Sequence, residues 1–248
     1  MDKVLIICGP TATGKTKLAL QLAKEFNGEL VSADSRQVYI GNDLETGKDK
    51  DVIKNSGIRV WLYDVIDQGQ DFSVSQWRRL ALDAISDILA RDKLPIVVGG
   101  SGLYIKALVE NLPDVDIPQD IDLRKSNKSV SELFNYLKSI DSIKADSLNN
   151  SDKNNPRRLI RAIEIAQYPS PNRRYRLLGE GLRVRYVLIG LTASKEELIK
   201  RIKERVRERG LDASYKQKEI NIMKKQLVWF KKQPHITWFD IRTCAKLV

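Results

Sequence analysis

The chain has 248 residues, of which 42% are apolar and 30% are charged, and its formal net charge is +11. This composition is typical of an ordinary folded protein, and no apolar run approaches the ~18–20 residues that span a bilayer. Its two cysteines, Cys8 and Cys244, exclude a disulfide framework and a zinc site, so we expect a cytoplasmic protein without a membrane segment. The positive charge favours a polyanion such as nucleic acid, although a lysine-rich solvated surface gives the same excess.

Two strand–loop–helix units are predicted in the N-terminal half. The apolar run at 3–9 is typical of a strand buried on both faces, and 16–26 continues at helical spacing. A long amphipathic helix is predicted over 72–93, with Ser73 as its N-cap. The other predicted elements are strands at 28–35, 60–66 and 94–102, a loop at 41–57 and a helix at 103–112. This order predicts an α/β fold with a parallel sheet flanked by helices, as in P-loop NTPases.

Residues 113–153 differ from the rest of the chain because Pro, Asp, Asn and Ser occur throughout them. Their best-supported element is a helix at 130–140, so we expect a small, mostly helical insertion within one catalytic core, formed by 1–112 and 154–248. The second core segment is predicted to hold a helix capped by Asn155 and Pro156, a strand at 185–191, a helix with a capping box at Ser194 and Glu197, and a basic last helix.

The stretch "GPTATGKT" at 9–16 fits the pattern G-x-x-x-x-G-K-[ST]. Its glycines let backbone N–H groups wrap around an anion, and the following helix adds its positive end. The Lys15 ammonium would add charge, and the Thr16 hydroxyl would ligate Mg²⁺. The pattern predicts a bound phosphate or pyrophosphate, for which ATP and GTP are the usual carriers. The predicted phosphate-binding residues are Gly9, Pro10, Thr11, Ala12, Thr13, Gly14, Lys15 and Thr16.

Asp34 follows the second predicted strand, where functional groups gather in an open α/β sheet. An acidic residue near a phosphate site is a candidate for proton transfer. An Asp-Ser pair is also common as the cap of a turn or helix, so both interpretations of Asp34 stand.

Four stretches together resemble the tRNA dimethylallyltransferase (tRNA isopentenyltransferase) family. They are "GPTATGKTKLA" (9–19), "DSRQVY" (34–39), "VVGGSGLYIKAL" (97–108) and "NNPRRLIRAIEI" (154–165), and 43–48, 201–211 and 224–232 agree with them. P-loop kinases share only the first stretch. The resemblance implies transfer of the five-carbon group of dimethylallyl diphosphate to N6 of an adenosine beside the tRNA anticodon, with release of pyrophosphate.

The resemblance also implies roles for individual residues. Asp34 would accept the proton of the amine, while Lys15, the loop amides and Mg²⁺ on Thr16 would stabilise the leaving pyrophosphate. Arg205 matches an arginine that grips the diphosphate. Ser101 would take the catalytic role of a threonine that usually contacts the target adenosine or the diphosphate, although a helix N-cap also explains it. The implied tRNA-binding residues are Asp34, Ser35, Arg36, Gln37, Ser101, Arg124, Arg157, Arg158, Leu159, Ile160 and Arg161.

The chain departs from the family pattern in two places. It is short, because the insertion is reduced and a stretch after Gly210 is absent, and Ile220 stands where an arginine is expected. Both departures weaken the expectation of full tRNA contacts. We expect a monomer that binds tRNA and dimethylallyl diphosphate.

Three other functions remain open from the sequence. An adenylate isopentenyltransferase acting on free AMP or ATP would share the loop and Asp34, although "DSRQVY" favours the tRNA enzyme. A small-molecule kinase would use an arginine lid, which 201–210 could supply. A non-catalytic RNA-binding protein would keep the loop without turnover.

Overall fold

The structure is a computed structural model, and it describes residues 1–41, 43–110, 112, 114, 117–168 and 184–242. Contacts divide the chain into two compact units, which we call the first unit (Met1–Glu110 with Leu178–Val248) and the second unit (Asn111–Leu177). In the parts of the chain that are described, no helix combines the length and the apolar character that crossing a membrane requires.

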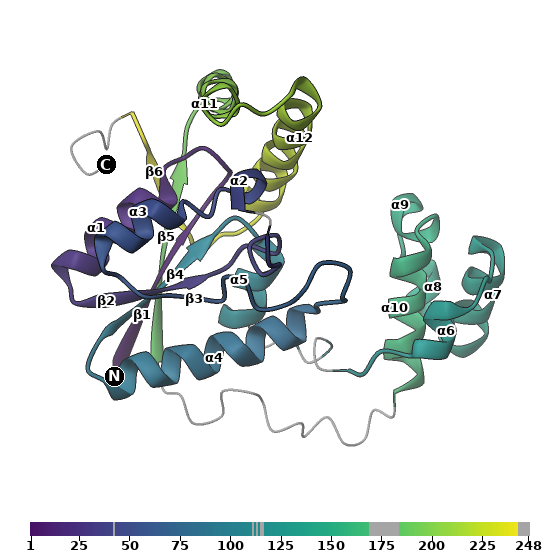
Figure 1. Cartoon of the computed structure of the whole chain (residues 1–248). Helices are drawn as coiled ribbons and strands as arrows, with labels where there is room; N and C mark the ends of the chain where they lie inside the picture. Colours follow the sequence, from purple (N-terminus) through teal and green to yellow (C-terminus); the bar gives the residue numbers. More distant parts are fainter. Residues whose placement is uncertain (42, 111, 113, 115–116, 169–183, 243–248) are drawn as a thin grey trace. The chain divides into compact units, whose positions relative to one another are not determined.

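A six-stranded parallel sheet forms the centre of the first unit (Figure 1). The strand order is β3-β2-β4-β1-β5-β6, so the chain crosses between neighbouring strands through helices, as parallel pairing requires. The strands are β1 (Asp2–Cys8), β2 (Gly28–Ser32), β3 (Val60–Trp61), β4 (Leu94–Gly99), β5 (Val184–Thr192) and β6 (Thr237–Asp240). The predicted parallel α/β fold is therefore confirmed.

Helices cover both faces of this sheet (Figure 1). One face packs on α4 and α5, and the other packs on α1, α11 and α12, because neighbouring residues of a buried strand point to opposite faces. The helices of this unit are α1 (Lys15–Glu25), α2 (Asp43–Thr46), α3 (Lys50–Ser56), α4 (Val74–Ala90), α5 (Gly102–Val109), α11 (Lys195–Glu208) and α12 (Ala213–Phe230). Helix α4 starts at Ser73 in a capping box with Gln76, as the pattern predicts.

The segment after β2 differs from its prediction. The predicted loop 41–57 contains α2 and α3, and the predicted strand 60–66 ends after two residues. Leu62 and Asp64 adopt left-handed backbone conformations, with φ of 66° and 54°, which stop the strand. The fully buried Lys48 ammonium fixes this bend, since it bonds to the Tyr39 carbonyl and to Asp43 and Asp64. These partners lie up to 16 residues from Lys48, beyond the spacing of helix, strand and turn patterns, so local pattern gave no sign of the pairing.

The second unit is helical and has its own apolar core. Its helices are α6 (Ile121–Lys125), α7 (Val130–Ile140), α8 (Ser142–Ser147), α9 (Asn150–Lys153) and α10 (Pro156–Gln167). The contacts give this unit wider bounds than the predicted insertion at 113–153. Helix α10 belongs to it, because Leu159 and Ile163 pack against Leu133 and Leu137 rather than on the sheet.

Candidate functional site

The loop between β1 and α1 has the geometry of a phosphate-binding loop. Gly9 has φ of 134°, and a Cβ at this position would lie 2.2 Å from the Leu191 carbonyl oxygen, so only glycine fits. Gly14 is left-handed and precedes the first residue of α1. The Pro10 carbonyl accepts hydrogen bonds from Lys15 Nζ (2.7 Å) and Thr13 Oγ1 (2.9 Å). The loop is thus already closed around its own lysine and leads directly into the positive end of α1.

Burial changes the acidity of the loop lysine. Removal from water lowers the pKa of Lys15 from 10.5 to about 8, and the nearby Asp34 carboxylate opposes this shift only in part. An anion beside Lys15 would restore the charged form, since it would add the opposite charge that burial leaves unmatched. The Lys15 ammonium is therefore the position in the loop where a bound anion would gain the most electrostatic stabilisation.

Asp34 lies at the end of β2, half-buried, and it forms a turn. One of its carboxylate oxygens, Oδ1, accepts a hydrogen bond from the Arg36 amide at 2.9 Å. The turn-capping role is thus present in the structure, and it holds the carboxylate in a defined orientation. Asp34 and Lys15 line the same cleft, so the position of Asp34 is compatible with the proton-transfer role predicted for it.

Ser101 does not cap α5 with its side chain, although it occupies the N-cap position. Its hydroxyl oxygen accepts a hydrogen bond from the Ser35 amide at 2.8 Å and donates one to Ser35 Oγ at 3.2 Å. Its own amide donates to the Ala33 carbonyl at 3.0 Å. These bonds join the ends of β2 and β4, so Ser101 and the segment after Asp34 are held together.

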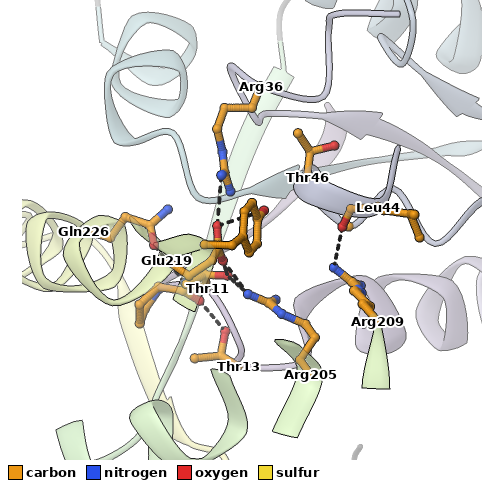
Figure 2. A network of polar contacts seen from close by, with 12 residues as sticks. Thr11, Thr13, Arg36, Leu44, Thr46, Arg205, Arg209, Glu219 and Gln226 are labelled. Carbon is orange, nitrogen blue, oxygen red and sulfur yellow. Dashed lines mark hydrogen bonds and ion pairs between the residues drawn. The ribbon is translucent and has the colours of Figure 1, made fainter. Parts of the chain in front are cut away.

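Arg205 reaches the phosphate loop from α11 (Figure 2). Its Nη2 donates to Thr11 Oγ1 at 2.9 Å and to Glu219 Oε2 at 2.5 Å. Glu219 lies on α12 with a side chain only 2% exposed, and it also accepts from Arg36 Nη1 at 2.8 Å. A buried carboxylate therefore connects the arginine of α11, the turn after β2 and the loop.

Glu219 is a site residue that the sequence prediction missed. The signal for it is an acidic residue on the buried face of α12, four residues after Tyr215 and four before Met223. A carboxylate among apolar neighbours requires a charged partner, which is a reason to search for arginines near it. Ile220, where the family resemblance implies an arginine, is buried in the apolar core beneath the same helix.

The phosphate loop, Asp34, Arg36 and Arg205 line a cleft of about 690 Å³ in the first unit. Gln37 is one wall of it, and both ends of its amide are bonded within the protein, to Ser32 Oγ (2.9 Å) and to the Thr46 carbonyl (3.1 Å). Tyr63 lies beside Gln37. Burial raises the pKa of Tyr63, so its phenol stays neutral. The charged residues that line the cleft are Lys15, Lys17, Asp34, Arg36, Asp49, Glu197, Lys200, Arg201, Glu204, Arg205, Glu208 and Arg209.

The remaining predicted tRNA-binding residues belong to the second unit, and the structure separates them into two groups. Arg157 and Arg158 are exposed at the start of α10, whereas Leu159 and Ile160 point into the apolar core and present no side chain to a partner. Arg124 and Arg161 are bonded to the buried carboxylate of Glu164. Arg124, Arg157 and Arg158 are thus the exposed arginines of this set, and Arg158 is also paired with Asp152.

The cleft fits a metal ion only as part of a metal–phosphate complex. Among the described residues, no group of three or more His, Cys, Asp or Glu side chains could hold a metal ion alone. Thr16 lines the cleft next to Lys15, at the position from which a hydroxyl would meet Mg²⁺ on a bound phosphate. Mg²⁺ typically binds in this way, with few protein ligands and several phosphate or water oxygens.

Comparison with known proteins adds independent evidence. The family model described as IPP transferase matches residues 37–212. The chain is 42% identical over 215 residues to a protein named tRNA dimethylallyltransferase from Acetivibrio thermocellus, covering 83% of this chain and 67% of that one. A protein of the same name from Anoxybacillus flavithermus is 34% identical over 286 residues, covering 97% and 91%.

A solved structure has the same fold. The full-length tRNA isopentenylpyrophosphate transferase from Bacillus halodurans matches with a TM-score of 0.64 and 31% identity, covering 97% of this chain and 90% of that chain. The alignment with the Anoxybacillus protein is longer than this chain of 248 residues. That relative therefore has internal residues that this chain lacks.

Proposed function

The chain belongs to the IPP transferase family, and on this premise we propose that it transfers the dimethylallyl group of dimethylallyl diphosphate to N6 of an adenosine beside a tRNA anticodon. One observation carries the proposal. Lys15 of the phosphate loop and an oriented carboxylate, Asp34, line the same cleft. A displacement at carbon needs both a site for the leaving phosphates and an acceptor for the proton of the attacking amine.

In this proposal the phosphate loop holds the diphosphate throughout the reaction. The loop amides, the Lys15 ammonium and Arg205 donate to its oxygens, where negative charge grows as the C1–O bond breaks. Donors fixed before the reaction stabilise this charge without reorganising. Lys15, Thr13 and Arg205 are all bonded to the loop already, which supports a preformed site.

Asp34 is the proposed base. The N6 lone pair attacks C1 of the dimethylallyl group, the C1–O bond pair leaves with pyrophosphate, and the N6 proton passes to the Asp34 carboxylate. An exocyclic adenine amine is a weak nucleophile, so the fixed orientation of Asp34 contributes through positioning as well as basicity. The hydrogen bond from the Arg36 amide supports this role, because it leaves the second oxygen, Oδ2, to accept the proton.

Thr16 is the residue we assign to Mg²⁺. A magnesium ion bound there with the diphosphate would neutralise the negative charge of the leaving group. The lack of an acidic metal cluster in the described residues fits this assignment, since the phosphate oxygens would supply the other ligands.

The tRNA is proposed to enter through exposed cations and to deliver one adenosine to the cleft. The adenine must leave its stack to reach Asp34, as in other enzymes that modify bases. Arg36 and Gln37 line the cleft beside Asp34, and we assign them to the wall against which the base would lie, with Ser35 and Ser101 bonded to each other next to them. Arg157 and Arg158 are the residues of α10 that we assign to tRNA phosphates.

The test is a transfer assay with a choice of acceptor. The purified protein is incubated with labelled dimethylallyl diphosphate, Mg²⁺ and unmodified tRNA, AMP or ATP. We expect label in tRNA alone. Label in AMP or ATP alone would establish the free-nucleotide enzyme, and label in none would reject the proposed function.

Asp34→Asn tests the base within the same assay. We expect turnover to fall by about 10²–10⁴-fold, the usual contribution of a general base, while diphosphate binding stays within about threefold of wild type. The control is Asp49→Asn, which removes a carboxylate from another wall of the cleft. Normal turnover in Asp34→Asn would show that Asp34 is not the base.

A further inference from the structure

Glu219 places a buried negative charge behind two arginines, Arg36 and Arg205, that line the cleft. Its carboxylate accepts from Arg36 and Arg205 at 2.8 and 2.5 Å, and also from Thr11 Oγ1 at 3.3 Å and the Tyr215 hydroxyl at 3.4 Å (Figure 2). These donors come from four separate parts of the first unit. Taking a carboxylate out of water is costly, and the two guanidinium groups against Glu219 offset that cost.

The two arginines that bind Glu219 also line the cleft. Each guanidinium has five N–H donors, so an arginine bonded to the carboxylate still has donors for a second anion. Arg205 uses Nη2 for Glu219 and Thr11. A carboxylate and a phosphate compete for the same kind of donor, and the bond to Glu219 fixes where the remaining donors point.

We propose, on the basis of the function proposed above, that Glu219 is a positioning residue that aims Arg205 and Arg36 at the diphosphate and limits the affinity of the cleft for pyrophosphate. Breaking the C1–O bond gives the product one more ionisable oxygen than the substrate. Repulsion from a fixed carboxylate grows with the charge of the ligand. Glu219 therefore weakens product binding more than substrate binding, and it favours release of pyrophosphate.

The experiment measures calorimetric affinity for inorganic pyrophosphate with Mg²⁺ present. Glu219→Gln keeps the shape and removes the charge, and we expect it to bind pyrophosphate about tenfold more tightly than wild type. The matched control is Glu208→Gln, which removes an exposed charge from the lining of the same cleft and should change the affinity less than about threefold. Unchanged or weaker binding by Glu219→Gln would overturn the inference.

Two further measurements separate charge from folding and from the proposed function. Glu219→Asp retains the charge, so tighter binding in that variant would also overturn the inference. In wild type the preference for pyrophosphate over dimethylallyl diphosphate should stay below about tenfold, and a larger preference would contradict the role of Glu219 even without a folded variant. If wild type binds neither ligand, both the proposed function and this inference fail. If transfer to tRNA occurs and the variants bind alike, only the inference fails.

Discussion

Each unit of the molecule buries one glutamate between two arginines, and we assign different roles to the two clusters. Glu219 in the first unit is bonded to Arg36 and Arg205, and its side chain is 2% exposed. Glu164 in the second unit is bonded to Arg124 and Arg161, and its side chain is 1% exposed. The carboxylates have similar surroundings, so their chemistry alone does not distinguish a site from a structural support.

The difference lies in what else the arginines and the carboxylate touch. Arg161 also donates to the carbonyls of Ile117 and Asp114, and Glu164 accepts from the Asp120 amide, so this cluster fixes the chain before α6. The arginines of Glu219 line a cleft instead. A buried ion cluster is therefore a functional candidate when its partners have donors directed to an open space, and a structural one when backbone carbonyls use them.

The largest effect is expected from Glu164→Ala. Its loss leaves two arginines and an amide without their acceptor, so the free energy of unfolding should fall by about 3 kcal/mol, measured by urea denaturation. Burial would raise the pKa of Glu164, but Arg124 and Arg161 outweigh it and hold that pKa below 4.5. The stabilisation is thus complete above that pH and is lost as the pH falls through the folded-state pKa. Pyrophosphate affinity should not change, and a change in it would remove the contrast between the clusters.

Arg205→Ala should weaken ligand binding and leave the stability of the fold nearly unchanged, the reverse of what we expect for Glu164→Ala. Pyrophosphate binding should weaken about a hundredfold, because a charged donor is lost from the loop, while stability changes by less than about 1 kcal/mol since Arg36 still pairs with Glu219. Arg201→Ala is the control, as Arg201 also lines the cleft but is paired with Glu197. Equal losses in both variants would show that Arg205 contributes only general positive charge.

A smaller effect should follow from the acidity of Lys15. With a pKa of about 8 the free lysine is mostly charged at pH 7 and mostly neutral at pH 9, so pyrophosphate affinity should fall about tenfold between these values. Lys15→Arg stays charged throughout and corrects for the ionisation of pyrophosphate itself. Parallel pH profiles for the two proteins would contradict the lowered pKa.

The smallest effect is expected from Arg157→Ala in the second unit. An exposed arginine on a tRNA phosphate should contribute about threefold to tRNA affinity and about one unit to the salt dependence of binding. Arg124→Ala makes the useful comparison, because this arginine supports Glu164 and should act mainly on stability. The salt dependence of the two variants, measured by filter binding, would show whether α10 presents a phosphate contact.

Part of this molecule could be predicted from sequence because its signals are local. The phosphate loop, the parallel sheet and the capped start of α4 follow from glycines, apolar runs and capping residues that lie within a few positions of each other. The bend after β3 and the assignment of α10 to the second unit could not be predicted, since they depend on Lys48 and Leu159 meeting distant partners.

The candidate site divides in the same way. Lys15, Thr16 and Asp34 are found from motifs, and the structure brings all three into one cleft. Glu219 stands out in sequence only as an acidic residue on an apolar helix face, and its partners, such as Thr11, lie almost a whole chain length away, so the sequence does not identify them. For Ser101 the local signal points to a different contact from the one observed. Its position before α5 predicts a helix cap, but its hydroxyl bonds to Ser35 instead.

In the proposed reaction the loop retains both phosphates while the carbon group leaves them. Dimethylallyl diphosphate labelled with ¹⁴C in the prenyl group and ³²P in the β-phosphate tests this directly with unmodified tRNA as acceptor. We expect ¹⁴C in tRNA, attached at N6 of one adenosine, and an equal amount of ³²P in free pyrophosphate. Transfer of ³²P to any acceptor, or release of pyrophosphate without ¹⁴C in tRNA, would contradict the proposed reaction.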